Sequence, residues 1–141
     1  MIQATIKVLI FIACLLAGAF VNGGLIQLGY TLISPPPGYN LNSEEGFQAA
    51  VKQMQFRHFI FPFLAHAFGT FASVWLWSSL NNQVRWQTVF LIAGFFFTGG
   101  ALMVYTVNAP FWFELLDLTY AYFPWAILAY LTRWSKLKII K

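Results

Sequence analysis

Long apolar stretches separated by short polar ones dominate the chain. Residues 8–33 carry no charged side chain, and three further apolar runs cover 57–80, 86–107 and 114–131. A helix that crosses a bilayer needs about 20 predominantly apolar residues, so each run is predicted to be a transmembrane helix. The predicted fold class is therefore all-α, a membrane-embedded bundle of four transmembrane helices forming a single domain over residues 1–141.

The segments between these runs contain residues that stop helices. Residues 34–38 include consecutive prolines, which lack the backbone donor that a helix needs and are typical of a rigid turn. Residues 81–83 indicate a tight polar turn, and residues 108–110 end the third span. Residues 44–55 place apolar side chains at helical spacing after Ser43, a potential N-cap. They are predicted to form a short amphipathic helix in the first outer loop, on the membrane surface or on the bundle.

Composition points to a surface that faces lipid. The chain is 60% hydrophobic, 20% aromatic and only 9% charged, whereas soluble domains carry about 25% charged residues. The net charge is +4, but half of the basic residues lie in the last nine positions, directly after an apolar run. There they are typical of a cytoplasmic tail at the membrane edge. We therefore expect membrane lipid as a partner, and no nucleic acid.

The basic residues also predict an orientation. With four spans, Lys7, Arg85 and the basic tail fall on one side of the membrane, and Lys52, Arg57 and all four acidic residues fall on the other. Loops rich in Lys and Arg stay in the cytoplasm, so both termini are predicted to be cytoplasmic. A cleaved signal peptide ending at residues 17–19 is the rival interpretation of the first span, but the apolar run continues well beyond it.

Polar groups within the apolar runs are the candidate functional residues, because such groups are costly in hydrocarbon. At about 1.5 Å of rise per residue, His66 lies roughly 13 Å below Arg57. On the same measure, polar side chains of the other spans reach nearby levels in the outer half of the bundle. The ligand-pocket candidates are Asn22, Gln27, His66, Thr70 and Tyr120. The predicted outer polar rim above them consists of Arg57, His58, Glu114 and Asp117.

Several candidates also have a purely structural interpretation. The amides of Asn22 and Gln27 could bond to a neighbouring helix, and His66 could do the same. Acidic residues such as Glu114 favour the first turn of a helix through its dipole. His58 lies eight residues before His66, about 80° around the helix, so the two cannot chelate one metal ion as an i, i+4 pair would. The single cysteine, Cys14, excludes an internal disulfide and a cysteine-rich metal site.

Known catalytic and cofactor motifs are missing from the sequence, which has no H-x-x-x-H pair, glycine-rich phosphate loop or Ser-His-Asp pattern. We expect no cofactor and no metal. The leading prediction is a small integral membrane protein with a binding or accessory role, which holds an apolar ligand, a lipid or a partner helix near His66. One alternative is a membrane enzyme or metal site that uses His58, His66, Glu114 and Asp117. Another is an oligomeric transporter or channel unit.

Four sequence segments carry a family resemblance. The segments GLIQLG…ISPPPGYN, RHFIFPFLAHAFGT, FFFTGGALMVY and APFWFELLDLTYAYFPWA are similar to those of small bacterial four-span integral membrane proteins of uncharacterised function. The resemblance covers most of the chain. It implies the four-span topology and a location in the bacterial cytoplasmic (inner) membrane. It implies no activity and no catalytic residue.

Overall fold

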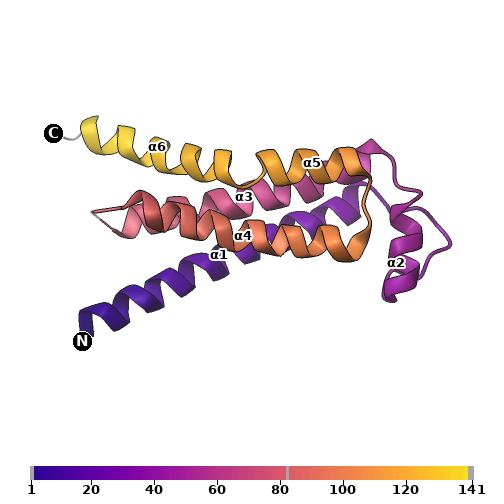
Figure 1. Ribbon diagram of the computed structural model, residues 1–141, viewed down its shortest axis with the longest axis horizontal. Helices are drawn as coiled ribbons and strands as arrows, with labels where there is room; N and C mark the ends of the chain where they lie inside the picture. Colours follow the sequence, from indigo (N-terminus) through magenta and orange to yellow (C-terminus); the bar gives the residue numbers. More distant parts are fainter. Residues whose placement is uncertain (1, 82, 140–141) are drawn as a thin grey trace.

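The computed structural model describes residues 2–81 and 83–139, with the surroundings of side chains described for residues 3–81 and 83–133. The described residues form helices and no β-strand, which confirms the all-α class. The helices are α1 (Ile2–Leu32), α2 (Glu44–Val51), α3 (Phe56–Leu80), α4 (Trp86–Val107), α5 (Phe111–Tyr120) and α6 (Phe123–Ile139). The first turn of α1 and the last turns of α6 lie at one end of the bundle, and α2 lies across the other (Figure 1).

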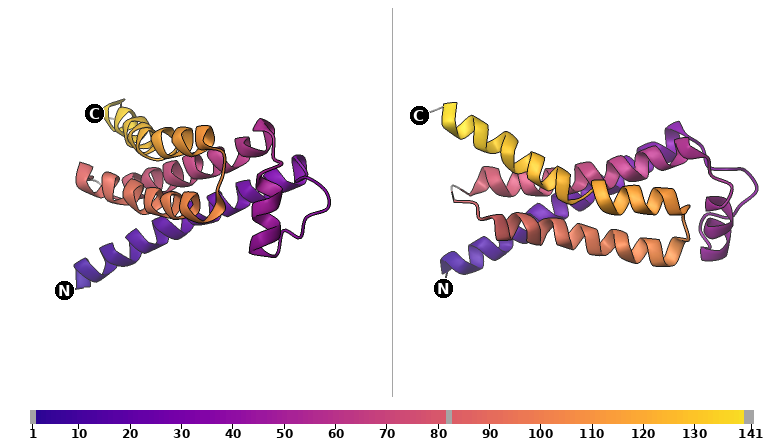
Figure 2. Two further views of the ribbon diagram at one scale, coloured as in Figure 1. Left: turned by 45° about the vertical axis from the view of Figure 1, so that its right-hand side comes forward. Right: turned by 45° about the horizontal axis from the view of Figure 1, so that its top comes forward.

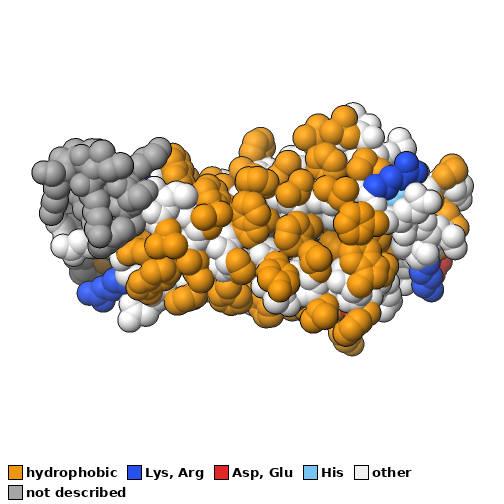
Figure 3. Space-filling view, turned by 90° about the horizontal axis from the view of Figure 1, so that it is seen from above, with side chains coloured by type: hydrophobic (Ala, Val, Ile, Leu, Met, Phe, Trp, Pro, Cys, Tyr) orange, Lys and Arg blue, Asp and Glu red, His pale blue; other side chains and the backbone are white. Residues whose placement is uncertain are grey.

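Within the described residues, three helices are long and apolar enough to cross a membrane: α1 over Gln3–Leu32, α3 and α4. The bounds of α4 are those predicted from the sequence, and α3 begins one residue earlier than predicted. Hydrophobic side chains cover the middle of the face seen in Figure 3, and basic side chains lie toward its two ends. This surface is what a lipid-facing bundle requires, so the fold indicates a membrane protein with three candidate spans.

The fourth predicted span is two helices instead of one. α5 ends at Tyr120, and the chain bends at Ala121 and Tyr122 before α6 begins. Pro124 favours the break, because a proline has no N–H for the carbonyl four residues earlier and its ring clashes with that carbonyl. Neither half reaches the length of about 20 residues that a span needs. The two nevertheless run end to end along the bundle (Figure 1).

The break between α5 and α6 is shielded from the surroundings by protein. Ala121 is 0% exposed and Tyr122 is 1% exposed. Irregular backbone at membrane depth is tolerated where protein covers it, because lipid cannot satisfy the freed N–H and C=O groups. Both residues belong to the main apolar core, together with side chains of α3, α4 and α6. The break is thus compatible with a position inside a membrane.

Helix α3 is the centre of the bundle, with α1, α4, α5 and α6 packed against it. Helix α1 crosses α3 obliquely and separates from α6 toward its own N-terminus (Figure 2). Glycines allow the close approach of α1 and α3, since a Cβ added to Gly69 would lie 2.9 Å from the carbonyl oxygen of Gly18. Extensive packing of α1 is confined to α3, so the side of α1 that faces α4 leaves room for a groove.

Helix α2 closes the end of the bundle opposite the termini. Its start is as predicted: the Ser43 hydroxyl accepts a hydrogen bond from the backbone N–H of Gly46 at 3.2 Å. It ends at Val51, four residues before the predicted end at Gln55, as the chain turns into α3. The amide Nε2 of Gln48 donates to the carbonyl of Thr106 at 2.9 Å, which fastens α2 to the last turn of α4.

Candidate functional site

A buried carboxylate links α3 to the break between α5 and α6. Nδ1 of His66 lies 2.9 Å from Oδ1 and 2.8 Å from Oδ2 of Asp117. The hydroxyl of Tyr122 donates to Oδ2 of the same carboxylate at 2.9 Å. The imidazole and phenol rings also stack, with centroids 5.5 Å apart. Asp117 is only 2% exposed, so these two side chains replace the water that a carboxylate would otherwise need.

Local backbone structure explains how Tyr122 reaches this carboxylate. In a continuous helix, residues five apart point about 140° away from each other around the axis. The break after Tyr120 removes that constraint and lets the Tyr122 side chain turn back toward Asp117. Gly100 of α4 provides the space, because a Cβ at this position would collide with the Tyr122 hydroxyl. Residues of α3, α4 and α5 thus all shape the His66–Asp117–Tyr122 cluster.

The cluster fixes which nitrogen of His66 is free. When Asp117 is ionised, the imidazole donates its Nδ1 proton to the carboxylate, as histidines oriented by a carboxylate commonly do. Among the described residues, Nε2 of His66 has no hydrogen-bond partner. The side chain is 18% exposed, whereas that of Asp117 is 3% exposed. Of the two side chains, His66 is therefore the one that a ligand can reach.

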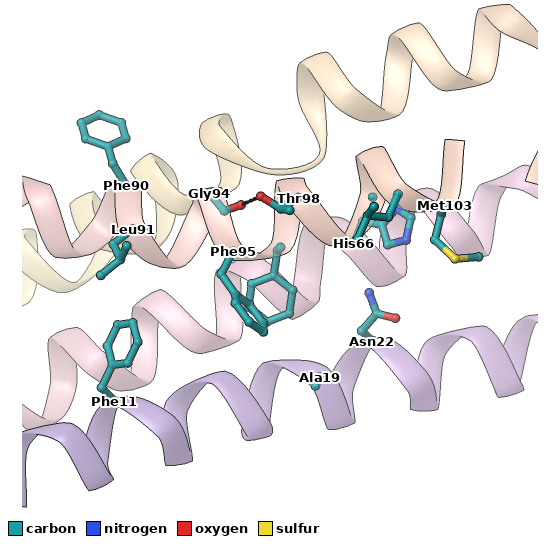
Figure 4. Close-up of a pocket in the computed structure, with 14 residues that line it drawn as sticks. Phe11, Ala19, Asn22, His66, Phe90, Leu91, Gly94, Phe95, Thr98 and Met103 are labelled. Carbon is teal, nitrogen blue, oxygen red and sulfur yellow. Dashed lines mark hydrogen bonds between the residues drawn. The ribbon is translucent and has the colours of Figure 1, made fainter. Parts of the chain in front are cut away.

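Two cavities meet at His66. One is an open groove of about 890 Å³ along α1 and α4, and the other is a chamber of about 300 Å³ beneath α2. The residues that line both are Asn22, His66, Gly100 and Met103. Figure 4 shows the Asn22 amide and the Met103 side chain near the imidazole at one end of the groove. His66 is thus reached both from the α2 end of the bundle and from its side.

The chamber beneath α2 has mainly apolar walls. Phe47 and Val51 of α2 line it, with Met54 of the following turn. Facing them are Phe59 of α3 and Phe113 of α5, which pack in one apolar cluster with Val51. The apolar positions spaced along α2 therefore lie on the bundle, over the chamber.

The structure separates the five predicted ligand-pocket residues. Asn22 and His66 line both cavities. Thr70 is fully buried and donates to the His66 carbonyl at 2.8 Å, so it supports the helix behind the site. Gln27 is exposed, because five residues turn it about 140° away from Asn22. Tyr120 is 59% exposed and lines a separate apolar groove of about 450 Å³ beside Trp112.

The residues of the predicted outer rim also separate. Arg57 is exposed at the start of α3, and Glu114 lies in the first turn of α5. His58 is bound to the backbone, since Nδ1 accepts from the N–H of Gln55 at 2.9 Å and Nε2 is 3.3 Å from the carbonyl oxygen of Ser34. Asp117 lies beside His66, deeper than a rim residue. Among the described residues, no group of three or more His, Cys, Asp and Glu side chains could hold a metal ion.

Two members of the site are absent from the sequence-based candidates. Tyr122 falls inside the fourth predicted span, 114–131, and Gly100 inside the third, 86–107, with no helical pattern in either run to mark them as site residues. Pro124 is the sequence feature that points to Tyr122, because a proline that breaks a helix lets the side chains just before it leave their helical directions. Tyr122 can then reach the carboxylate of Asp117, which lies about one turn before the break.

Comparison with protein-family models, with curated proteins and with solved structures gave no match. The resemblance to small bacterial four-span membrane proteins therefore stays a prediction. Fold and site together define the class of protein: a helical chain with three candidate membrane spans and a buried His–Asp–Tyr cluster where two cavities meet.

Proposed function

We propose that the chain is a small multi-pass protein of the bacterial cytoplasmic membrane that binds an amphiphilic small molecule at His66. In this proposal α1, α3, α4 and the α5–α6 pair are the four spans, and both termini are cytoplasmic. The amphipathic α2 covers the outer end of the bundle. The end-to-end arrangement of α5 and α6 and the common end of the termini support this topology (Figure 1).

One observation carries the binding proposal: within the described residues Nε2 of His66 has no hydrogen-bond partner, and this side chain lies where two largely apolar cavities meet. Small-molecule sites are concave and mostly apolar, with a few polar groups that fix the orientation of the ligand. Asp117 and Tyr122 hold the imidazole in place before any ligand arrives, so little side-chain freedom is lost on binding. Asn22 adds a second polar group on the opposite helix.

The His66–Asp117 pair also favours a second candidate function, proton transfer by an enzyme. A carboxylate that orients a histidine is the arrangement of a general base. Among the described residues that line the two cavities, however, there is no serine, cysteine or lysine to act as a nucleophile. The lining of the cavities therefore favours proton transfer over covalent catalysis as the enzymatic alternative to binding.

Native mass spectrometry of the detergent-purified protein tests the proposal. We expect a bound molecule on the wild type and on Gln27→Ala, whose side chain points away from the cavities, and none on His66→Ala. Asn22→Ala provides a second test, because this amide has no hydrogen bond within the described residues whose loss would impair folding. It should lower the bound fraction several-fold.

Three outcomes would contradict binding at His66. They are a wild type without a bound molecule, a molecule that persists on both His66→Ala and Asn22→Ala, and a stoichiometric metal ion in elemental analysis of the same sample. Size-exclusion elution at the wild-type volume shows that each variant is folded.

A further inference from the structure

The structure also indicates what kind of amphiphile fits the site. We infer that the ligand has an uncharged, oxygen-bearing head, as in a quinone or a long-chain alcohol, and that its chain lies in the groove along α1 and α4. This inference rests on the proposed function and adds the class of the ligand.

The polar end of the groove suits a neutral head. No lysine or arginine is among the described residues that line either cavity, so the cations that normally hold a phosphate are missing. A carboxylate head would be repelled by Asp117 nearby. A hydroxyl group, in contrast, can donate to Nε2 of the neutral His66 imidazole and accept from the Asn22 amide, and a carbonyl oxygen can accept from that amide, in both cases without any net charge.

The depth of the site leads to the same conclusion. His66 is ten residues into α3, or about 15 Å along its axis from the α2 end. A bilayer has a hydrocarbon core about 30 Å thick, so the imidazole falls near its middle. Phospholipid head groups remain at the interface because charge is costly in hydrocarbon. A ligand head group that reaches His66 must therefore be uncharged, so that it can enter the hydrocarbon core. A quinone ring and a hydroxyl group both meet this condition.

The groove has the length and lining for an apolar chain. It extends along α4 from Met103 to Phe90, or about 20 Å of helix axis. Apart from Asn22, His66 and Thr98, its lining residues are apolar or glycine, and the Thr98 hydroxyl is already bonded to the Gly94 carbonyl at 2.8 Å (Figure 4). The groove is open on the side of the bundle, so a chain can slide in directly from the bilayer.

Glycines in the groove offer a direct way to block it. A Cβ added to Gly94 meets no atom within 4 Å, so Gly94→Leu places its side chain in the space that the ligand chain would occupy. Gly23 of α1 has the same open surroundings but lines neither cavity. Gly23→Leu is therefore the matched control, since both changes replace a helical glycine by a better helix former.

The experiment titrates delipidated protein in detergent with three probes: a decyl-substituted benzoquinone, dodecanol, and dioleoylphosphatidylglycerol as the charged control. Binding is measured by native mass spectrometry. We expect one molecule of the quinone or of the alcohol per chain on the wild type and on Gly23→Leu, with the tighter of the two identifying the head group. Affinity should fall at least tenfold in both Gly94→Leu and His66→Ala, and the phospholipid should not compete.

The outcomes separate this inference from the proposed function. If a molecule binds in a His66-dependent way but Gly94→Leu has no effect, or if the phospholipid competes equally, the ligand class is wrong and the site stands. If neither neutral probe binds, the ligand class is likewise refuted. If the wild type instead forms a dimer that Gly94→Leu dissociates, a second copy covers the groove and the inference is overturned. If no molecule binds in a way that depends on His66, the proposed function itself is refuted.

Discussion

The hydrogen bond from Tyr122 to Asp117 can be removed with almost no change in shape. Tyr122→Phe deletes one oxygen and retains the buried ring with its stacking on His66. Asp117 then keeps only the imidazole as a donor. Tyr120→Phe is the matched control, because this tyrosine lies two residues earlier, is 59% exposed, and has no hydrogen bond within the described residues.

The expected loss follows from the type of bond and its burial. A hydrogen bond to a charged group contributes about 1.5–3 kcal/mol to stability. The carboxylate of Asp117 is almost fully buried, so water does not readily replace the missing hydroxyl. We therefore expect Tyr122→Phe to lower the free energy of unfolding by about 2 kcal/mol, within that range. Tyr120→Phe should change it by less than about 0.5 kcal/mol, as is usual for surface substitutions.

Unfolding in mixed micelles, followed by circular dichroism as dodecyl sulfate is titrated in, measures both values. A double-mutant cycle with Asp117→Asn isolates the pair, and side chains in direct contact typically couple by about 0.5–3 kcal/mol. Equal losses for Tyr122→Phe and Tyr120→Phe, or a coupling energy of zero, would refute the reasoning. The hydroxyl and the carboxylate would then not stabilise the folded state together.

Two further substitutions test the fold around the site. Gly18→Ala should destabilise the protein by about 1–3 kcal/mol in the same titration, because its methyl group would collide with the carbonyl oxygen of Gly69. Gly23→Ala is the control and should be neutral or mildly stabilising, because its methyl group would lie in open space. A similar loss of stability in both variants would exclude the close crossing of α1 and α3. Pro124→Ala restores the missing backbone donor, so circular dichroism should show more helix and native mass spectrometry should show less bound ligand. An unchanged circular dichroism spectrum would show that Pro124 does not cause the break.

The candidate spans were predictable from sequence because length and hydropathy decide them. The bounds of α4 follow from its apolar run, with Arg85 before it and Asn108 at its end. The break between α5 and α6 was not predictable on the same grounds. Pro62 lies inside α3 without interrupting it, whereas Pro124 coincides with a break. A proline frees backbone groups in either case, and the neighbouring helices decide whether the chain bends.

The site was partly predictable for a related reason. Helical rise sets the depth of a side chain, so Asn22 and His66 could be placed near the same level. Rise does not show which side of a helix faces the bundle, and the apolar residues of these spans surround each helix without a clear stripe. Gln27 and Tyr120 therefore lie at a suitable depth, but on sides of their helices that face away from the two cavities at His66. The predicted position of Asp117 in the rim follows from its depth alone, since it lies three residues into the fourth predicted span.

Burial of the Asp117 carboxylate is itself an argument for a functional site. Replacing a buried ion pair by well-packed apolar side chains is often neutral or stabilising, so such a pair is weak support for a purely structural role. Here the carboxylate receives two donors and lies next to a buried break in the chain, and within the described residues Nε2 of His66 has no partner. Apolar packing would stabilise the fold without a buried carboxylate, and stability does not require a free imidazole nitrogen. Both features of the carboxylate, its two donors and its place beside the break, are needed to hold the His66 imidazole in a fixed direction, and the free Nε2 is then available to a ligand.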